Sequence, residues 1–581
     1  MIKLFRWLWV FSGTVLLVWG FWTRSLFWIH LFWQTLVWGL VVAEVVIFLR
    51  ERYLSFSSIL ILLWTFFFYT IYGKHFFGGI ERVLFLSQDM YVLNATLTLS
   101  FLAIWLVKNS TFLTWISRKG WQPYMVIVFS FFVLIWTGTI LLLFPFSRQG
   151  NEPLSFLDAL FTATSAVCVT GLTVLDTGKD FSLIGQMVIL GLIQVGGLGL
   201  MVFAGAFAFM LGKGLSIQGG MTLTSALGTS SFREVREMVR SILFFTLGWE
   251  LLGTILLFFG FLPGKNWGEA AYYALFHSIS AFCNAGFSLF SESLMGVREN
   301  VLVILTVGFL IIFGGLGFGV IRNLWWFLKK VLWIKDGIRS GKLQDVDEEV
   351  IKRLRENTYL RLHTKIVLRM TIFLIVTGMI LVFFLEYNGE LRGMSLGQKL
   401  LHSFFAAVTP RTAGFNTIDY GSVSRPTLLL TMVLMFVGAS PGSTGGGIKT
   451  VVAFLVLLNT YYVLRETLRV KVGNREVPFE SIRKAYLIFV MSMLWVSLVF
   501  GLLLFFEPKF SFEQLLFEVI SAFGTVGLST GITSGLSPVS KVLIILTMFF
   551  GRVGPLTLFY GIGFTSEKIV VRYLKEDVMV A

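Results

Sequence analysis

The segment from Phe517 to Gly527 reads FEVISAFGTVG, and three other stretches of the chain repeat its pattern. Each copy begins with Phe and ends ten residues later with Gly, and three of the four carry Ser-Ala at the same offset. The copies recur at near-equal intervals of about 120 residues, which indicates a repeated structural unit. The other copies are FTATSAVCVTG (Phe161–Gly171), FHSISAFCNAG (Phe276–Gly286) and FFAAVTPRTAG (Phe404–Gly414).

A helix-capping signature stands shortly before each copy. In such a signature, the first residue caps the amide groups of the first helical turn. We therefore expect a short helix of about three turns that runs inward and points the negative end of its dipole at the membrane centre. The closing Gly then lets the backbone turn and approach an axis without a Cβ in the way. The signatures are Ser155-x-x-Asp158, Asn266-x-x-Glu269, Ser395-x-x-Gln398 and Ser511-x-x-Gln514.

The composition around the copies is that of a membrane protein. Of the 581 residues, 56% are hydrophobic and 14% are charged, whereas soluble proteins are about 25% charged. Too few polar side chains remain to cover a soluble protein of this size, so a soluble enzyme and a disordered chain are both excluded. Two Cys and five His offer no zinc-binding spacing. The net charge of +15 fits basic cytoplasmic loops better than nucleic-acid binding.

Twelve apolar runs are long enough to cross the bilayer, which takes about 20 residues as a helix. The copies between the later runs are too short to cross, and such re-entrant segments are tolerated where they face protein or a watery cavity. Lys and Arg concentrate in segments such as Arg322–Arg369, which predicts that both termini are cytoplasmic. The runs are Leu4–Trp22, Leu26–Leu49, Leu54–Tyr72, Val83–Val107, Pro123–Pro145, Phe181–Leu211, Met238–Phe261, Val301–Leu328, Thr364–Glu386, Pro426–Leu464, Arg483–Phe506 and Ser540–Tyr573.

The predicted fold is therefore an all-α polytopic membrane protein, with four helix–pore-helix–helix units around one pore and four extra N-terminal transmembrane helices. The extra helices are scaffolding by default, and docking of lipid or a partner is the alternative. The predicted parts are an appendage (residues 1–121), unit 1 (122–212), unit 2 (213–330), a cytoplasmic loop with unit 3 and its intramembrane gating loop (331–464), and unit 4 with the C-terminal tail (465–581).

Four glycine-ended loops around one axis would form rings of carbonyl oxygens, which can replace the water shell of a monovalent cation. The fourth loop carries Thr-Val-Gly, the start of the Thr-Val-Gly-Tyr-Gly filter of potassium channels. The alternative is that small residues merely permit close packing, but packing glycines need no capped helix before them. The predicted selectivity filter is Val169, Thr170 and Gly171; Asn284, Ala285 and Gly286; Thr412, Ala413 and Gly414; Thr525, Val526 and Gly527.

A gate is predicted below the filter. Each helix after a filter loop carries a second glycine cluster. The run after the third filter loop, Pro426–Leu464, is 39 residues long, roughly twice what the bilayer requires. Its glycine- and proline-rich middle cannot stay helical, so we expect an intramembrane loop; simple kinking is the alternative. It is not a phosphate-binding loop, because Ile448 separates the last glycine from the lysine. The predicted gate is Ser440, Pro441, Gly442, Ser443, Thr444, Gly445, Gly446, Gly447 and Lys449, together with Arg552.

Three basic residues sit in or beside apolar runs, where a charge is costly and by default functional. Arg552 is expected in the cavity, where it would repel cations and bind the loop; pairing with an acidic residue in the protein body is the alternative. Lys449 is either part of the gate or a snorkelling interfacial lysine. Arg411 is expected to be a buried structural cation bonded to loop carbonyls. Cys168 and Cys283, each three residues before a filter glycine, are read as small packing residues.

With these motifs, the chain resembles the Trk/Ktr/HKT superfamily of potassium transporters, and within it the Ktr-type membrane subunit. The resemblance covers about Pro123 to Ala581. It is carried by Phe161–Asp176, Ala281–Phe287, Thr409–Asp419, Ser440–Thr450, Ser521–Gly531 and Gly551–Thr557.

The resemblance implies potassium uptake across the cell membrane, driven by the membrane potential and with sodium dependence as an option. It implies that potassium, the transported ion, binds the backbone carbonyls of Thr170, Gly171, Ala285, Gly286, Ala413, Gly414, Val526 and Gly527. In plant relatives a Ser in place of the first filter Gly accompanies sodium preference, so Gly171 favours potassium. It also implies a homodimer and a cytosolic nucleotide-binding regulatory subunit, since this chain has no dinucleotide-binding fingerprint. No cofactor of its own and no nucleic-acid partner are expected.

Two other functions were weighed against potassium uptake. A sodium-selective or non-selective cation channel of the same architecture stays open, because selectivity depends on site number and field strength in loops that differ from one another. A polytopic membrane enzyme needs catalytic carboxylates, His or metal ligands, and His30, His75, His277, His363 and His402 form no motif. The chain is therefore predicted not to be an enzyme.

Overall fold

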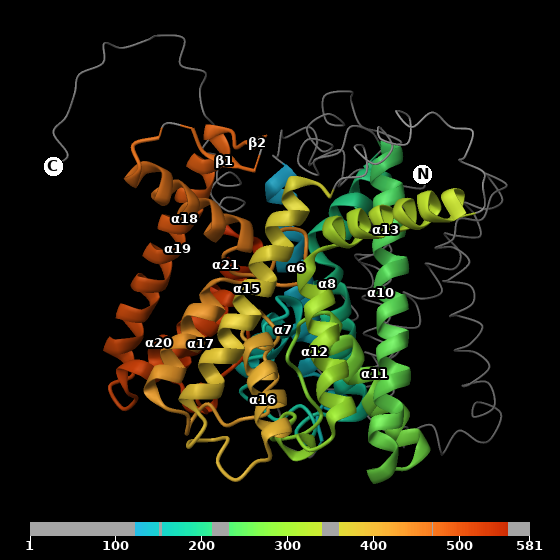
Figure 1. Ribbon diagram of the computed structural model, residues 1–581. Helices are drawn as coiled ribbons and strands as arrows, with labels where there is room; N and C mark the ends of the chain where they lie inside the picture. Colours follow the sequence, from blue (N-terminus) through green and yellow to red (C-terminus); the bar gives the residue numbers. More distant parts are fainter. Residues whose placement is uncertain are drawn as a thin grey trace, which may run out of the picture. The chain divides into compact units, whose positions relative to one another are not determined.

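The computed structural model describes residues 123–149, 154–211, 232–339, 360–467, 469–473 and 475–555 (Figure 1). The predicted appendage of residues 1–121 lies outside these ranges, as do most of the cytoplasmic loop and the C-terminal tail. The chain divides into two compact bodies, Met1–Lys119 with Phe144–Pro153, and Gly120–Leu143 with Leu154–Ala581. The described part of the first is a short stretch with the 3-10 turn Pro145–Ser147. The elements below belong to the second body.

The second body is helical, as predicted, apart from a two-stranded antiparallel hairpin that the sequence did not suggest. Its strands are β1 (Lys471–Val472) and β2 (Arg475–Glu476). Its long and short helices alternate in the predicted order. They are α6 (Pro123–Leu143), α7 (Phe156–Val167), α8 (Leu183–Leu211), α10 (Phe232–Phe261), α11 (Trp267–Phe282), α12 (Val301–Leu316), α13 (Phe318–Arg339), α15 (Leu362–Leu385), α16 (Leu396–Val408), α17 (Arg425–Phe436), α18 (Thr450–Leu464), α19 (Phe479–Phe506), α20 (Phe512–Gly524) and α21 (Pro538–Val553).

Within the described residues, three segments are helical, long and apolar enough to cross a membrane: Arg240–Gly264, Leu362–Leu385 and Phe479–Phe506. Only 22% to 33% of their most apolar windows is buried, and large side chains such as Phe244 and Phe505 point outward. A surface this apolar is expected where lipid chains, not water, are the solvent. The shorter apolar helices α6, α8, α17 and α18 belong to the same bundle (Figure 1).

The sequence predicted one continuous span from Val301 to Leu328, and this is wrong. The helix ends at Leu316 and restarts as α13 at an angle of 98°. Gly317 at the break has φ +87°, a conformation that glycine adopts without steric cost. The helix α13 continues to Arg339, beyond the predicted end of unit 2 at residue 330.

The short helices α7, α11, α16 and α20 begin where the capping signatures placed them. The hydroxyls of Ser155, Ser395 and Ser511 each accept from the backbone amide three residues on, and the latter two form complete capping boxes. Asn266 occupies the N-cap of α11, but its side chain makes no cap hydrogen bond, so that signature is confirmed in position and not in mechanism.

The third copy is shifted by one residue relative to the others. The opening Phe of the other copies is fully buried (Phe161, Phe276 and Phe517), but in copy 3 the fully buried ring is Phe405 and not Phe404. The aligned phenylalanine was therefore misassigned. Copy 3 has one residue fewer between its buried Phe and its Gly, which a gapless alignment on Phe404 could not reveal.

The outer ends of paired helices are clasped by side chains. Glu386, the C-cap of α15, accepts from the backbone amide (2.9 Å) and hydroxyl (2.7 Å) of Ser424, the N-cap of α17. Glu507, the C-cap of α19, likewise accepts from the backbone amide of Ser537 at the start of α21 (2.5 Å). Each carboxylate thus caps the positive end of the neighbouring helix.

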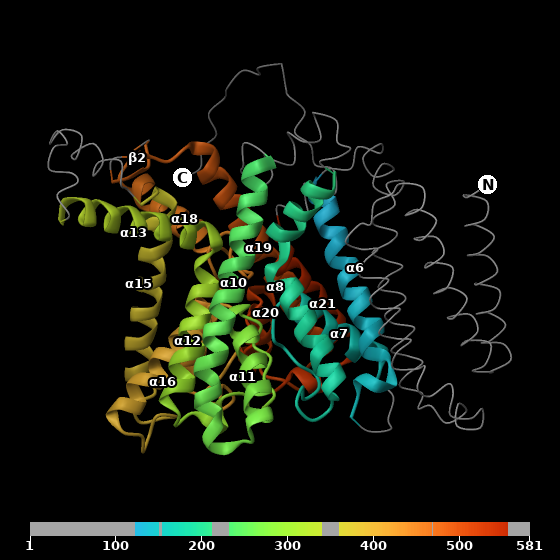
Figure 2. The same cartoon turned by 90° about the vertical axis from the view of Figure 1, so that its right-hand side faces the viewer.

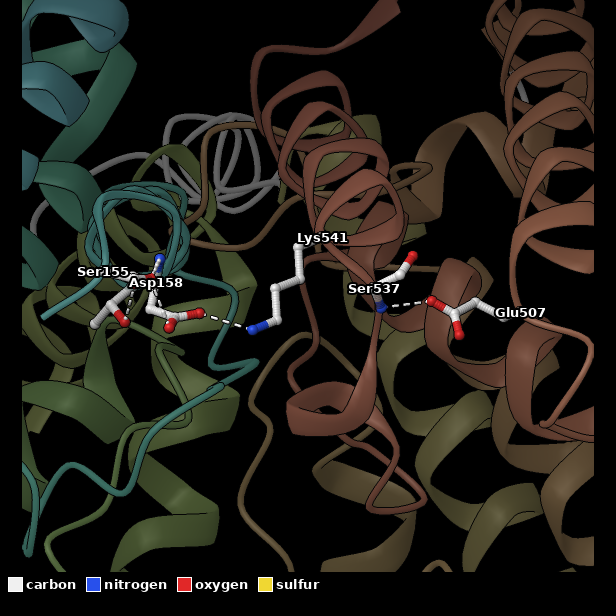
Figure 3. A network of polar contacts seen from close by, with 6 residues as sticks. Ser155, Asp158, Glu507, Ser537 and Lys541 are labelled. Carbon is white, nitrogen blue, oxygen red and sulfur yellow. Dashed lines mark hydrogen bonds and ion pairs between the residues drawn. The ribbon is translucent and has the colours of Figure 1, made fainter.

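A contact between units 1 and 4 stands next to the second clasp (Figure 3). Lys541 of α21 forms an ion pair with Asp158 in the first turn of α7, at 2.7 Å between Nζ and Oδ1. Asp158 is also bound by Ser155, the cap of α7. This ion pair joins residues that are 383 positions apart in the sequence, at the same side of the bundle as the clasps.

Candidate functional site

Each short helix is followed by a loop with the same unusual backbone. Two residues before every closing Gly, a residue other than glycine has positive φ, and the Gly itself has φ between +71° and +90°. A non-glycine residue in this region is uncommon, so its recurrence in every copy marks a shared loop conformation. The non-glycine residues are Val169 (φ +56°), Asn284 (+59°), Thr412 (+73°) and Thr525 (+49°), and the glycines are Gly171, Gly286, Gly414 and Gly527.

The loop glycines lie against one another in a closed circle. A Cβ added to Gly171 would lie 2.5 Å from the carbonyl oxygen of Ala285, and a Cβ on Gly286 would lie 2.7 Å from that of Ala413. In the same sense, a Cβ on Gly414 would overlap the carbonyl of Val526, and one on Gly527 would overlap that of Thr170. The predicted filter residues of all four copies are therefore brought together, and at each glycine the space of a side chain is taken by the next loop.

The Ser of the repeated Ser-Ala pair holds the loop. In copies 1 and 4, the hydroxyls of Ser165 and Ser521 accept from the amides of Gly171 (3.1 Å) and Gly527 (3.2 Å). In copy 2, Ser280 donates instead to the carbonyl of Phe287 (2.8 Å). In copy 3, Thr409 donates to the equivalent carbonyl of Phe415, which again shows the one-residue shift.

The broken middle of the run Pro426–Leu464 lies directly beneath two of these loops. Its helices α17 and α18 are separated by residues 437–449, as predicted. The amide of Gly446 donates to the Thr525 hydroxyl (2.9 Å), and a Cβ on Gly445 would overlap the hydroxyl of Thr412. The predicted gate thus contacts the predicted filter in units 3 and 4.

The same loop is also tied to the break between α12 and α13. The amide of Ser440 donates to the carbonyl of Gly315 (3.1 Å), and the amide of Phe318 donates to that of Gly442 (3.1 Å). A Cβ on Gly317 would lie 2.8 Å from the carbonyl oxygen of Pro441. Neighbouring glycine clusters therefore serve each other, because each leaves room for the other's backbone.

Arg552, near the end of α21, reaches the loop from the opposite side. Its guanidinium donates to the backbone carbonyls of Thr444 and Gly196, and the side chain is 7% exposed. Among the described residues no acidic group pairs with it, so the alternative of an acidic partner is not what the structure contains. Of the two expectations for Arg552, contact with loop carbonyls is the one found.

The other two basic residues take different positions. Lys449 is half-buried, and its ammonium donates back to the carbonyl of Gly445 (2.5 Å), so it closes the loop on itself and does not snorkel. Arg411 is buried as expected, but within the described residues its guanidinium donates to the hydroxyl of Thr371 on α15 (3.2 Å) and not to a loop carbonyl. That part of the expectation for Arg411 was wrong. Cys168 and Cys283 are buried free thiols.

The second glycine clusters explain how the helices cross below the loops. A Cβ on Gly196, Gly314 or Gly551 would overlap a carbonyl at the end of a short helix, belonging to Val167, Phe282 and Phe523 respectively. These glycines are packing residues, which is the role that had been weighed for the filter glycines.

Sequence reasoning missed two buried acidic residues behind the loops. Glu250 on α10 accepts from the Gln194 amide (3.0 Å) and lies 3.8 Å from the Cys283 sulfur. Glu518 on α20 binds the hydroxyls of Ser529 (2.9 Å) and Thr533. A lone carboxyl in an apolar run was a signal that could have found both. Within the described residues no group of three His, Cys, Asp or Glu could hold a metal ion.

Comparison with known proteins decides the family. The profile of the family described as "TrkH: Cation transport protein" matches residues 87–570. The chain belongs to the TrkH family of cation transport proteins. The family match begins at residue 87, earlier than Pro123, where the resemblance was expected to start. Membership also excludes the alternative of a membrane enzyme.

Individual relatives agree with the family. The chain is 38% identical over 454 residues to the Ktr system potassium uptake protein B of Bacillus subtilis, covering 78% of this chain and 95% of that protein. It is 35% identical over 460 residues to the potassium/sodium uptake protein NtpJ of Enterococcus hirae, covering 78% and 96%. The fold is similar to the crystal structure of the potassium transporter TrkH from Vibrio parahaemolyticus, with TM-score 0.56, 19% identity and coverage of 92% and 97%.

Proposed function

We propose that this chain takes up potassium through a pore at the centre of the four glycine-ended loops. The observation that carries the proposal is the closed circle in which every loop glycine abuts the backbone carbonyl of the next loop. Carbonyl oxygens on one axis can replace the water of a monovalent cation, and fixed loops keep them in position. The filter residues are the twelve named from the sequence, and potassium binds at carbonyls of the last two residues of each loop.

The loop Ser440–Gly447, with Lys449 and Arg552, forms the gate in this proposal. Support comes from its contacts with Thr525 and Thr412 above and with Arg552 below. A guanidinium beneath a cation filter raises the energy of a permeating cation, and its donors tether the loop at the same time. Opening then requires that the contact between Arg552 and Thr444 break.

The wider organisation follows the sequence. We propose twelve spans with both termini in the cytoplasm of a cell-membrane protein, and four pore units preceded by the appendage of residues 1–121. As the resemblance of the sequence implies, we propose that the chain works as a homodimer with a cytosolic nucleotide-binding regulatory subunit. The membrane potential drives uptake, at about 2.3 kcal/mol per charge and 100 mV.

The test is cation flux into proteoliposomes that contain the purified full chain, with potassium and sodium compared side by side. We expect potassium to enter faster than sodium. Equal rates or faster sodium entry would favour the second candidate, a sodium-selective or non-selective transporter of the same architecture, which the name of the Enterococcus relative supports. No flux of either cation from folded protein, in the presence and absence of a regulatory subunit, would overturn both.

A further inference from the structure

The helix α13 leaves α12 at 98° and runs across the bundle in both views (Figures 1 and 2). In both views α10 and α15 stand upright, so with these long apolar helices along the membrane normal α13 lies in the plane of the membrane surface. Its first turn is anchored by Val320 and Ile321, which are buried against Val367 of α15. From Leu324 onward, the helix carries side chains of two kinds on two sides.

The apolar and basic residues of α13 follow helical spacing. Leu324, Phe327, Leu328 and Val331 recur at i, i+3, i+4 and i+7 and form an apolar stripe. Arg322 and Lys329 are seven residues apart and share another side, next to Trp326. The exposed fractions are 58% for Trp325, 62% for Trp326 and 59% for Leu332, so each of these large side chains is more than half exposed, although the Trp325 ring also meets Phe245 of α10 edge-on at 6.2 Å between centroids.

We propose that α13 is a membrane-surface helix that binds anionic phospholipid headgroups. Exposed tryptophans beside lysines are the composition of helices that lie at the headgroup level, with the apolar side toward acyl chains and basic groups toward phosphates. The Lys329 ammonium lies 5.8 Å from the Trp326 ring centroid, so charge and ring are presented together. An apolar surface alone would fit a second copy of the chain, but the adjoining positive charge is complementary to an anionic lipid.

This helix is directly connected to the proposed gate. Its first amide, on Phe318, donates to the carbonyl of Gly442 (3.1 Å), and the Ser440 hydroxyl donates to the carbonyl of Gly315 just before the bend (2.9 Å). Val451, two residues after Lys449, packs against the same cluster as Ile321. Tilting of α13 would therefore move the loop at Gly442 and the start of α18 at Val451.

A lipid that binds one arrangement of α13 stabilises the loop conformation that goes with it. In the arrangement described, the loop is bound to Thr525 above and Arg552 below. Anionic lipid is thus inferred to hold the loop under the filter and to lower flux. This second step rests on the proposed function, whereas lipid binding by α13 does not.

Binding is tested with a dye at the helix surface. The native cysteines are both buried, so a Leu332→Cys variant of the full chain can be labelled selectively with an environment-sensitive dye. We expect blue-shifted emission and quenching by spin-labelled lipid in phosphatidylglycerol vesicles, and weaker quenching in phosphatidylcholine. Equal quenching in both lipids would overturn the preference for anionic lipid. Blue-shifted emission without quenching in phosphatidylglycerol vesicles would mean that protein, such as a second copy, covers the helix, and would overturn the proposal.

Gating is tested by potassium flux as the phosphatidylglycerol fraction is raised. Flux should fall in the wild type, and Lys329→Gln should weaken the attachment of α13 about fivefold and so require more anionic lipid for the same inhibition. Lys265→Gln, which removes a lysine between α10 and α11, is the matched control and should behave as the wild type. Flux that is independent of lipid charge while the dye reports binding would overturn the gating step. Absence of any wild-type flux would instead count against the proposed function.

Discussion

At Gly171 the backbone of the next loop fills the position of a side chain. The residue has φ +90°, and a Cβ would lie 2.5 Å from the carbonyl oxygen of Ala285. A residue with a Cβ costs about 1 to 2 kcal/mol in a left-handed conformation, before any overlap is counted. The geometry of the carbonyl circle therefore depends on the absence of an atom at this site.

We expect Gly171→Ser to lower the ratio of potassium to sodium flux toward one and to reduce the Tm. The Tm should fall because a Cβ at this position would overlap the carbonyl of Ala285 and require a shift of the backbone. Gly191→Ser is the matched control, because nothing lies within 4 Å of a Cβ on that glycine. Flux of both cations and thermal unfolding in detergent are the measurements. Unchanged selectivity in the Gly171 variant would remove this loop from the filter.

Arg552 is the second residue at which function and structure can be separated. Arg552→Gln keeps some hydrogen-bond donors and removes the charge, so potassium flux should rise with selectivity unchanged. Arg552→Lys keeps the charge but not the forked geometry that reaches Thr444 and Gly196 together, and should be intermediate. Arg411→Gln is the control, since that buried arginine binds Thr371 and should affect Tm without raising flux. A destabilised Arg552→Gln protein with no gain in flux contradicts the gate.

The loop between α17 and α18 is hydrogen-bonded to parts of units 2 and 4. It reaches Gly315 of α12, Thr525 of the fourth filter loop and Arg552 of α21. Deletion of Ser443 and Thr444 removes the carbonyl bound by Arg552 and shortens the loop. We expect faster potassium flux in proteoliposomes. Unchanged or slower flux in a well-folded deletion would argue that the loop does not obstruct the pathway.

The clasps at the outer ends of helices make stability sensitive to acid. Burial by itself raises the pKa of Glu507, but hydrogen bonds from Ser537 and Ser540 and the charge of Lys509 outweigh it, so the pKa is lowered. The pKa of Glu386 is lowered in the same way, against burial, by Thr427, Ser424 and the Glu390 amide. A lowered folded pKa gives stability that is present above the unfolded pKa, about 4.3, and is lost as pH falls through the folded value.

We therefore expect the wild-type Tm to fall below about pH 4.3. Glu507→Gln should have a lower Tm at pH 7 and lose less on acidification. Glu513→Gln is the control, because within the described part of the chain Glu513 forms an exposed ion pair with Arg425 (3.7 Å), and such pairs contribute about 0 to 1 kcal/mol. Parallel pH profiles for the wild type and Glu507→Gln would exclude the clasp as the cause.

Elements could be predicted from the sequence where the signal was local. Hydrophobic runs, capping residues and the broken middle of Pro426–Leu464 each depend on neighbouring residues, and the helices follow them. The one-residue shift at Phe405 and the bend at Gly317 were missed, because a deletion in one copy and a helix break are decided by what packs against them. For Gly317 that neighbour is the carbonyl of Pro441.

At the scale of the molecule, the circle of loops requires unit 4 to return to unit 1. Glycine spacing predicted that the copies share an axis, but nothing in it identified their partners. The pairing of Lys541 with Asp158 joins residues 383 positions apart, and such contacts are invisible to patterns with short periods. The carboxyls Glu250 and Glu518 were missed although a lone carboxyl in an apolar run is a local signal, but the partner of Glu250, Gln194, is 56 positions away and is not visible in the sequence pattern.

The ion pair between Asp158 and Lys541 connects unit 1 to unit 4 and should contribute to stability. The Asp158–Lys541 pair is 2.7 Å long, with side chains 23% and 14% exposed, and Asp158 is fixed by Ser155. A charged hydrogen bond in this setting is expected to contribute about 1.5 to 3 kcal/mol, more than an exposed ion pair. Asp158→Asn and Lys541→Met should each lower the Tm, and the double variant should lose less than the sum of the two.

The matched comparison is the Arg425–Glu513 pair, which joins units 3 and 4 with side chains 86% and 40% exposed. Its double-variant cycle should be close to additive. Because the first and fourth filter loops meet where Gly527 abuts the carbonyl of Thr170, loosening Asp158–Lys541 should also reduce the ratio of potassium to sodium flux, whereas loosening Arg425–Glu513 should not. Additive losses at both pairs, with selectivity unchanged, would mean that the circle is closed by packing of α7 against α21 and not by this ion pair.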